Sequence, residues 1–190
     1  MQFLIDNMSA LLVFTAVALM VAVTQSRATN DSIEQTISYA SKKQLLDLGT
    51  TLEDEIKLIG EGMPSNQHIT AFTTNSDGQT TSFKFWRNDG VDDLEVEYKL
   101  VFVDSVTTTT ETFATYRMDR YENGVIAGSS PSSLRDFKVE PLNAAGNVTV
   151  PASARLVRVA IINSYPLGDL DNMYIGQTHY GITLHPSNLD

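Results

Sequence analysis

The first 25 residues of the chain read MQFLIDNMSALLVFTAVALMVAVTQ and contain one charged side chain, Asp6. From Met8 to Val23 sixteen residues follow one another without a formal charge. At about 1.5 Å per residue they form about 24 Å of helix, which is shorter than the roughly 30 Å hydrocarbon core of a bilayer. Adding residues 3–5 lengthens the helix to about 31 Å, so that Asp6 then lies inside the apolar span.

Three interpretations of this segment compete, because a carboxylate at membrane depth is costly unless it reaches the interface or has a partner. A cleavable secretory signal is disfavoured, since no Lys or Arg precedes the apolar run. A plain membrane anchor would use Asp6 and Asn7 to cap the helix from the interface. An assembling helix would pack against copies of itself and pair Asp6 with a cation of a neighbour.

Beyond the apolar run, a stripe of apolar side chains predicts that the helix continues in amphipathic form. The stripe consists of Ile33, Ile37, Ala40, Leu45, Leu48, Leu52, Ile56 and Ile59. Gly60, Gly62 and Pro64 are expected to end the helix. A continuous helix over residues 3–59 would be about 85 Å long.

Within the stripe, Gly49 permits a bend or a short break, so we assign it as a candidate hinge. Thr50 and Glu53 could form a capping box directly after it, as could Ser32 and Gln35 further upstream. If the helix is a filament core element, the substitution Gly49→Ala should stiffen it and gain up to about 1 kcal/mol of helix propensity.

After Pro64 the apolar pattern changes to a period of two, as in LEVEYKLVFVD at residues 94–104, which is typical of a half-buried strand. Similar segments lie at residues 82–87, 111–121, 134–142, 154–163 and 174–185. Gly- and Asn-rich turn sequences separate several of them. The sequence therefore predicts an α+β chain, with a long N-terminal helix, half membrane and half amphipathic, before an antiparallel β domain of about six or seven strands. Its expected parts are residues 1–27, 28–62 and 63–190.

This layout resembles the type IV pilin class, most closely minor pilins and the larger pseudopilins of type II secretion. In that family the apolar stretch begins with a Phe-Thr-Leu-Ile-Glu-like motif whose acid is the fifth residue of the mature chain. Here QFLID places Asp6 fifth when counted from Gln2, with Asp in place of the usual Glu. The segments KKQLLDLGTTLEDEIKLIGEG (42–62), LRDFKVEPLNAAGN (134–147) and ARLVRVAIIN (154–163) are similar to the helix end and paired strands of the same proteins.

The resemblance implies a structural subunit of a pilus-like surface or secretion filament, with the helix in the core and the β domain exposed. It implies that Asp6 pairs with the N-terminal amine of a neighbouring subunit, and that the partners are copies of the chain or related pilin-like subunits. The expected location is the inner membrane with an exported β domain, or a cell-surface filament. The alternative is a single-pass membrane-anchored β-domain subunit of another envelope or membrane complex.

Composition and motifs favour a non-enzymatic role without cofactors. The net charge of −10 disfavours nucleic acid as a partner, and the absence of cysteine excludes disulfides and thiolate metal sites. His68, His179 and His185 lie in separate segments without an HExxH spacing, so no metal site is predicted. Neither a G-x-S-x-G motif nor a P-loop occurs, and no small-molecule substrate is evident.

Overall fold

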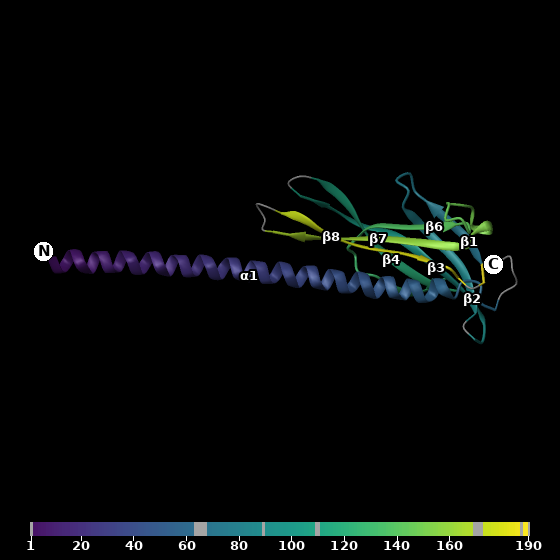
Figure 1. Ribbon diagram of the computed structural model, residues 1–190, viewed down its shortest axis with the longest axis horizontal. Helices are drawn as coiled ribbons and strands as arrows, with labels where there is room; N and C mark the ends of the chain where they lie inside the picture. The colour runs from purple at the N-terminus through teal and green to yellow at the C-terminus, as the bar shows by residue number, and fades with distance from the viewer. Residues whose placement is uncertain are drawn as a thin grey trace. The chain divides into compact units, whose positions relative to one another are not determined.

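A computed structural model of the chain describes the backbone of residues 2–62, 68–88, 90–108, 111–168, 173–186 and 188–189, and side chains from Asn7 onward within them. One long helix precedes eight strands in this part of the chain (Figure 1). The elements are α1 (Gln2–Lys57), β1 (Ile69–Thr74), β2 (Thr80–Asn88), β3 (Asp93–Thr107), β4 (Thr112–Glu122), β5 (Val125–Ser129), β6 (Leu134–Leu142), the short 3₁₀ helix η1 (Pro151–Ser153), β7 (Leu156–Leu167) and β8 (Tyr174–Leu184). The predicted α+β layout is confirmed, and β1 and β5 are strands that the quoted segments lack.

The chain divides into two compact units, Met1–Tyr39 and Ala40–Asp190. This boundary falls inside the predicted amphipathic segment 28–62 rather than at its start. The apolar stripe accordingly changes character along the helix: Ile33 is 52% exposed, whereas Leu52 is 1% exposed. Only the part of the stripe from Leu45 onward contributes to the core of the second unit.

Helix α1 continues without interruption through both predicted capping boxes, so those two caps are wrong. The hydroxyl of Thr50 donates to the carbonyl of Leu46 at 2.9 Å, which ties this side chain back to its own helix instead of capping a new one. The predicted helix end is confirmed at Lys57. Gly60 follows at a φ of 74°, a left-handed conformation that favours glycine.

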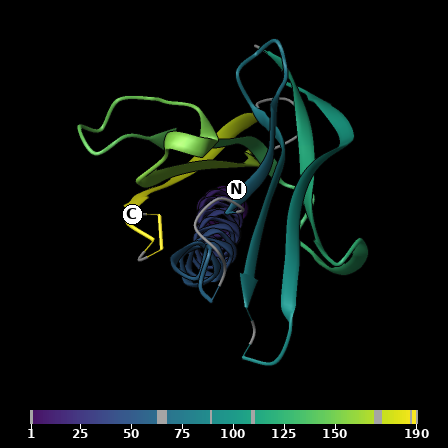
Figure 2. The ribbon, with the colours of Figure 1, turned by 90° about the vertical axis from the view of Figure 1, so that its right-hand side faces the viewer.

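The strands form one antiparallel sheet in the order β1-β2-β3-β4-β6-β7-β8, with β5 paired to β4. The sheet is nearly divided in the middle, because β4 and β6 pair only at Tyr116 and Leu134. Thr80 adds a second link, since its hydroxyl accepts a hydrogen bond from the amide of Val139 at 2.9 Å. Figure 2 looks along the helix and shows the two parts of the sheet on two sides of its C-terminal portion.

The core of the second unit lies where the helix meets both parts of the sheet. The helix supplies Leu45, Leu52, Ile56 and Ile59, and the strands supply Phe83, Phe85, Val96, Tyr98, Met118, Leu134, Phe137, Val139, Val157, Val159, Ile161 and Leu184. The alternation predicted for residues 94–104 is confirmed for Val96 and Tyr98 but not for Phe102, which is 58% exposed. A register shift between Phe102 and Asp104 interrupts regular pairing there.

Gly49 has a packing role that the sequence did not reveal. A Cβ atom at this position would lie 2.6 Å from the ring of Tyr180 on β8, closer than real Cβ atoms approach their neighbours. Withdrawal of the Tyr180 ring would disturb the hydrogen bond that its hydroxyl donates to Glu53 on the same helix at 3.3 Å. The hinge itself stays a prediction, and the close approach gives an independent reason for glycine here.

We therefore expect Gly49→Ala to lower the stability of the chain instead of raising it. The helix-propensity gain of about 1 kcal/mol is opposed by overpacking, which typically costs about 1–3 kcal/mol. Urea unfolding of the detergent-solubilised full chain measures the difference. In a Tyr180→Ala background the same substitution should stabilise, and a stabilising effect in the wild-type background would refute the packing role.

Candidate functional site

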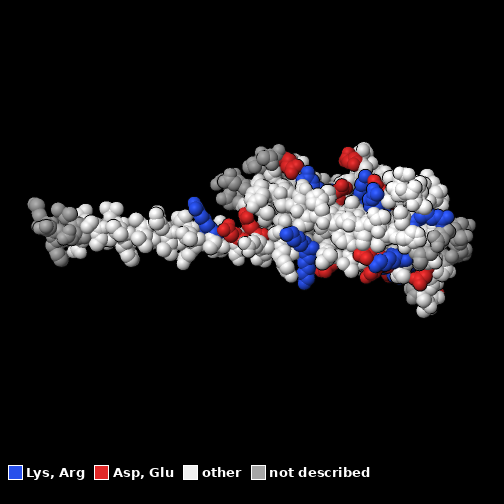
Figure 3. Space-filling view, in the orientation of Figure 1, with Lys and Arg blue, Asp and Glu red and all other residues white. Residues whose placement is uncertain are grey.

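The first part of α1 presents an apolar surface that nothing in the described chain covers. Leu11, Leu12, Phe14 and Met20 are each at least 70% exposed. Figure 3 shows no charged side chain along this stretch on the face in view. Among the described residues, α1 is the helix long and apolar enough to cross a membrane, which makes it a candidate membrane anchor.

The structure leaves the partner of Asp6 open. The backbone at Asp6 belongs to α1, but the side chain lies outside the described residues. Asp6 and Gly49 fall in different compact units. The pairing of Asp6 with a cation therefore stays a prediction from the sequence.

A buried ionic cluster joins the other end of α1 to the sheet. Arg120 of β4 donates to Oε1 of Glu55 from Nε at 2.8 Å and from Nη2 at 2.5 Å, and Nη2 also donates to Glu122 at 2.6 Å. The Tyr98 hydroxyl of β3 donates to the second oxygen of Glu55. Arg87 of β2 lies 3.9 Å from Glu55. Three strands thus converge on one helical carboxylate whose side chain is 12% exposed.

The environment of the cluster keeps its donors protonated. Burial, followed by the negative charge of Glu55, raises the pKa of the Tyr98 hydroxyl. Burial works against the charge on Arg120, but hydrogen bonds to Glu55 and Glu122 outweigh it and raise the pKa of the guanidinium. A carboxylate held by two charge-assisted bonds and a hydroxyl is well satisfied, so the cluster fixes α1 against the sheet and offers no reactive group.

One local pattern in the sequence indicates this cluster. Glu55 lies three residues after Leu52 and four before Ile59, at a spacing that belongs to the buried face of the helix. An acid among such positions indicates a buried partner. The partner itself comes from Arg120, 65 residues away, which no local pattern predicts.

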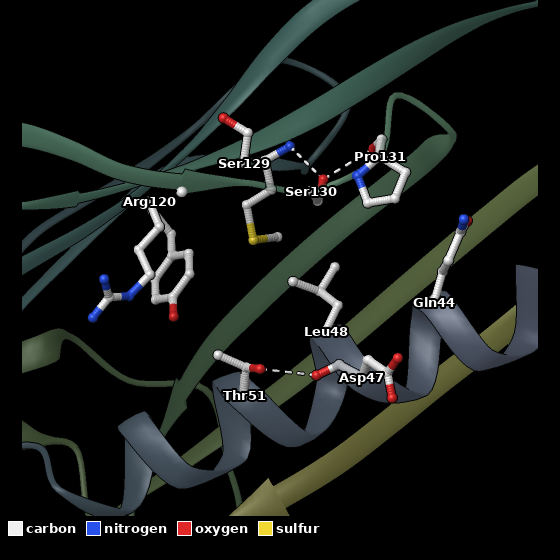
Figure 4. A pocket seen from close by; sticks show the side chains of 11 residues that line it. Gln44, Asp47, Leu48, Thr51, Arg120, Ser129, Ser130 and Pro131 are labelled. Carbon is white, nitrogen blue, oxygen red and sulfur yellow. Dashed lines mark hydrogen bonds between the residues drawn. The ribbon is translucent and has the colours of Figure 1, made fainter.

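Beside the cluster, a pocket of 360 Å³ opens between α1 and the end of β5 (Figure 4). Leu48 of the helix and Met118 of β4 form apolar parts of its lining, and Gln44 and Asp47 contribute polar groups. The described residues contain no group of three or more His, Asp or Glu side chains able to hold a metal ion.

Comparison of the chain with protein-family models, curated proteins and solved structures finds no match.

Removing the cation of the cluster should destabilise the chain strongly. Arg120→Met leaves Glu55 without the guanidinium that donates twice to its Oε1. Breaking a buried pair costs about 3–5 kcal/mol, and partial exposure of these side chains places the expected loss at the low end. The double variant Glu55→Leu/Arg120→Met should recover part of the loss, because the buried carboxylate is removed together with its main cation, although Arg87 then also loses its contact with Glu55. The exposed control Lys57→Met, which breaks a pair with Glu53, should change the unfolding free energy by less than about 1 kcal/mol.

The raised pKa of Tyr98 predicts a specific loss of stability in alkali. An unfolded tyrosine has a pKa of about 10, so the stabilisation is fully present below that pH and is lost as the pH rises above it, by up to about 1.4 kcal/mol per pH unit. Tyr98→Phe should be less stable at neutral pH but should lose less between pH 10 and 11. Urea unfolding between pH 10 and 11 tests this prediction. The control Tyr39→Phe, whose ring is exposed, should follow the wild type. If the unfolding free energy of Tyr98→Phe falls with pH as steeply as that of the wild type, the raised pKa of Tyr98 is not the cause of the loss.

Proposed function

We propose that the chain is a structural subunit of a pilus-like surface or secretion filament. The apolar part of α1 would form the filament core with other copies, and the β unit would lie outside. The observation that carries the proposal is the uncovered apolar surface over residues 8–23. Soluble monomers rarely expose contiguous apolar patches larger than a few hundred Å², so lipid or other helices must cover it.

The second compact unit supports a structural role for the helix. Because α1 runs unbroken into the core of residues 40–190, a load on the helix would act on packed side chains and not on a loose linker. The Glu55 cluster ties the helix to three strands at the far end of this contact. A subunit that is held in an assembly through its helix needs a firm connection of this kind between the helix and the rest of the subunit.

Before assembly, α1 would anchor the subunit in the inner membrane with the β unit exported. Arg27, Lys42 and Lys43 all follow the apolar run, and large domains translocate largely regardless of such charges. The alternative, a single-pass anchored subunit of another membrane complex, rests on the same apolar surface, with lipid alone covering it. The two differ in whether copies of α1 must pack together.

The charge of Asp6 separates the two functions. If Asp6 is paired among packed helices, Asp6→Asn should leave its partner unpaired at a cost of roughly 3–5 kcal/mol. At about 1.4 kcal/mol per tenfold change, the ratio of assembled to membrane-resident subunit should fall by two to four orders of magnitude. Asp6→Glu keeps the charge and should largely restore assembly.

The measurement is the amount of chain in sheared surface filaments relative to the membrane fraction, with filaments examined by negative-stain electron microscopy. Membrane insertion of Asp6→Asn serves as the internal control and should persist. Normal assembly of the asparagine variant would rule out the paired charge. Absence of any filament of the wild-type chain would favour the anchored alternative.

A further inference from the structure

Strand β5 presents an edge on which another strand could pair. All five residues of Val125–Ser129 are exposed, and within the described residues β5 pairs only with β4. Natural edge strands are commonly protected by charged side chains or proline, and β5 contains neither. Its unpaired backbone groups match an extended segment, the recognition mode in which a peptide adds a strand to a sheet.

The 360 Å³ pocket lies directly beside this edge. Gly128 belongs to β5 and lines the pocket, whereas Leu48 and Asp47 line it from the helix (Figure 4). The polar groups of Tyr98 and Arg120 are already engaged by Glu55. The pocket therefore offers a mainly apolar lining, the side-chain amide of Gln44 and the exposed carboxylate of Asp47, which has no ion-pair partner among the described residues.

Residues 147–150 of the same chain form a segment that could fill this pocket and pair with this edge, because it is extended and carries exposed apolar side chains. Val148 and Val150 are 64% and 62% exposed, and two residues apart in an extended segment they point to the same side. The amide of Thr149 donates to Pro141 at 2.9 Å and ties one edge to the chain itself. The amide of Val148 then points away from that edge, toward any added neighbour.

Charge complementarity links this segment to the pocket. Arg155 follows the segment closely, is exposed, and contacts the carbonyl of Leu189. It has no carboxylate partner in the described part of the chain. Asp47 at the pocket is an exposed acid that likewise has no ion-pair partner in the described part of the chain. In a chain with a net charge of −10, contact between copies is favoured where an acid of one meets a cation of the other.

We propose that residues 147–150 of one copy pair with β5 of the next, placing a valine in the pocket and Arg155 near Asp47. Donor and acceptor are different surfaces, and Figure 2 shows the 143–150 loop and the β4–β5 hairpin on opposite sides of the second unit. Such a heterologous contact propagates from copy to copy. The proposal deepens the filament function, on which it rests for the assembly of copies, but the contact does not involve Asp6.

Disulfide trapping tests this contact in the full chain, which has no cysteine of its own. Gly128→Cys introduces a side chain where a Cβ meets nothing within 4 Å, and Val148→Cys places its partner on the donor. The double variant should give a ladder of dimers and larger species on oxidation, and a mixture of the two single variants should give dimers only. The control pair Val91→Cys/Val148→Cys, in which Val91 is 85% exposed, should give none.

Each outcome has a defined reading. Absence of the ladder, or dimers from Gly128→Cys alone, would overturn the proposal, the latter by indicating symmetric β5 pairing. Asp47→Arg should abolish the ladder and Arg155→Asp in the same chain should restore it. If Asp6→Asn stops filament assembly while filaments of the Gly128→Cys/Val148→Cys variant with Asp6 intact give no ladder, the strand contact fails alone. If Asp6→Asn assembles normally and the ladder persists, the Asp6 pairing fails and the strand contact stands.

Discussion

The packing of the C-terminal part of α1 into the sheet is the constraint on which the rest of the second unit depends. The two parts of the sheet are joined through a single residue pair between β4 and β6, through Thr80, and through contacts of Arg135 with Gln79 and Glu111. This junction lacks the continuous ladder of backbone hydrogen bonds that joins the other neighbouring strands. Leu52 and Ile56 fill the space between them, so burial of the helix, at about 25 cal/mol per Å² of apolar surface, is what makes one core out of two partial sheets.

The Glu55 cluster adds orientation to that packing. Apolar contacts are non-directional, and a helix among aliphatic side chains could rotate or slide with little penalty. A carboxylate held by Arg120 and Tyr98 at once has one acceptable position. Buried ion pairs often contribute little net stability, so we interpret the cluster as fixing the rotation and register of α1, the property that a helix shared between two compact units requires.

Much of this fold could be predicted from local sequence patterns, because an amphipathic helix and a half-buried strand each repeat their apolar residues at a characteristic spacing. The apolar run, the stripe from Leu45 and six of the strands follow from those periods. Strand β5 was missed because its residues are all exposed and show no alternation. The packing reason for Gly49 was missed because Tyr180, which occupies the space, lies 131 positions further along the sequence.

The candidate sites divide in the same way. Asp6 stands out because an acid in an apolar run violates a local rule, and Gly49 because glycine is rare inside helices. Glu55, Arg120 and the pocket beside β5 depend on contacts between segments far apart in sequence, which one sequence does not encode in any short pattern. The sequence therefore predicted the exposed apolar run more directly than the contacts between distant segments.

The Lys and Arg side chains without a carboxylate partner in the described part of the chain lie in the regions through which we propose that copies of the chain meet. The salt bridges of the described residues use nine of the 13 Lys and Arg side chains. The four without a carboxylate partner among the described residues are Arg27, Lys42 and Lys43 on α1, and Arg155 after the proposed donor segment. Copies of an acidic chain repel one another over a Debye length of about 8 Å, so close packing requires cations not already neutralised within their own chain. The unpaired cations lie on the helix and beside the proposed donor segment, the two regions through which we propose that copies meet.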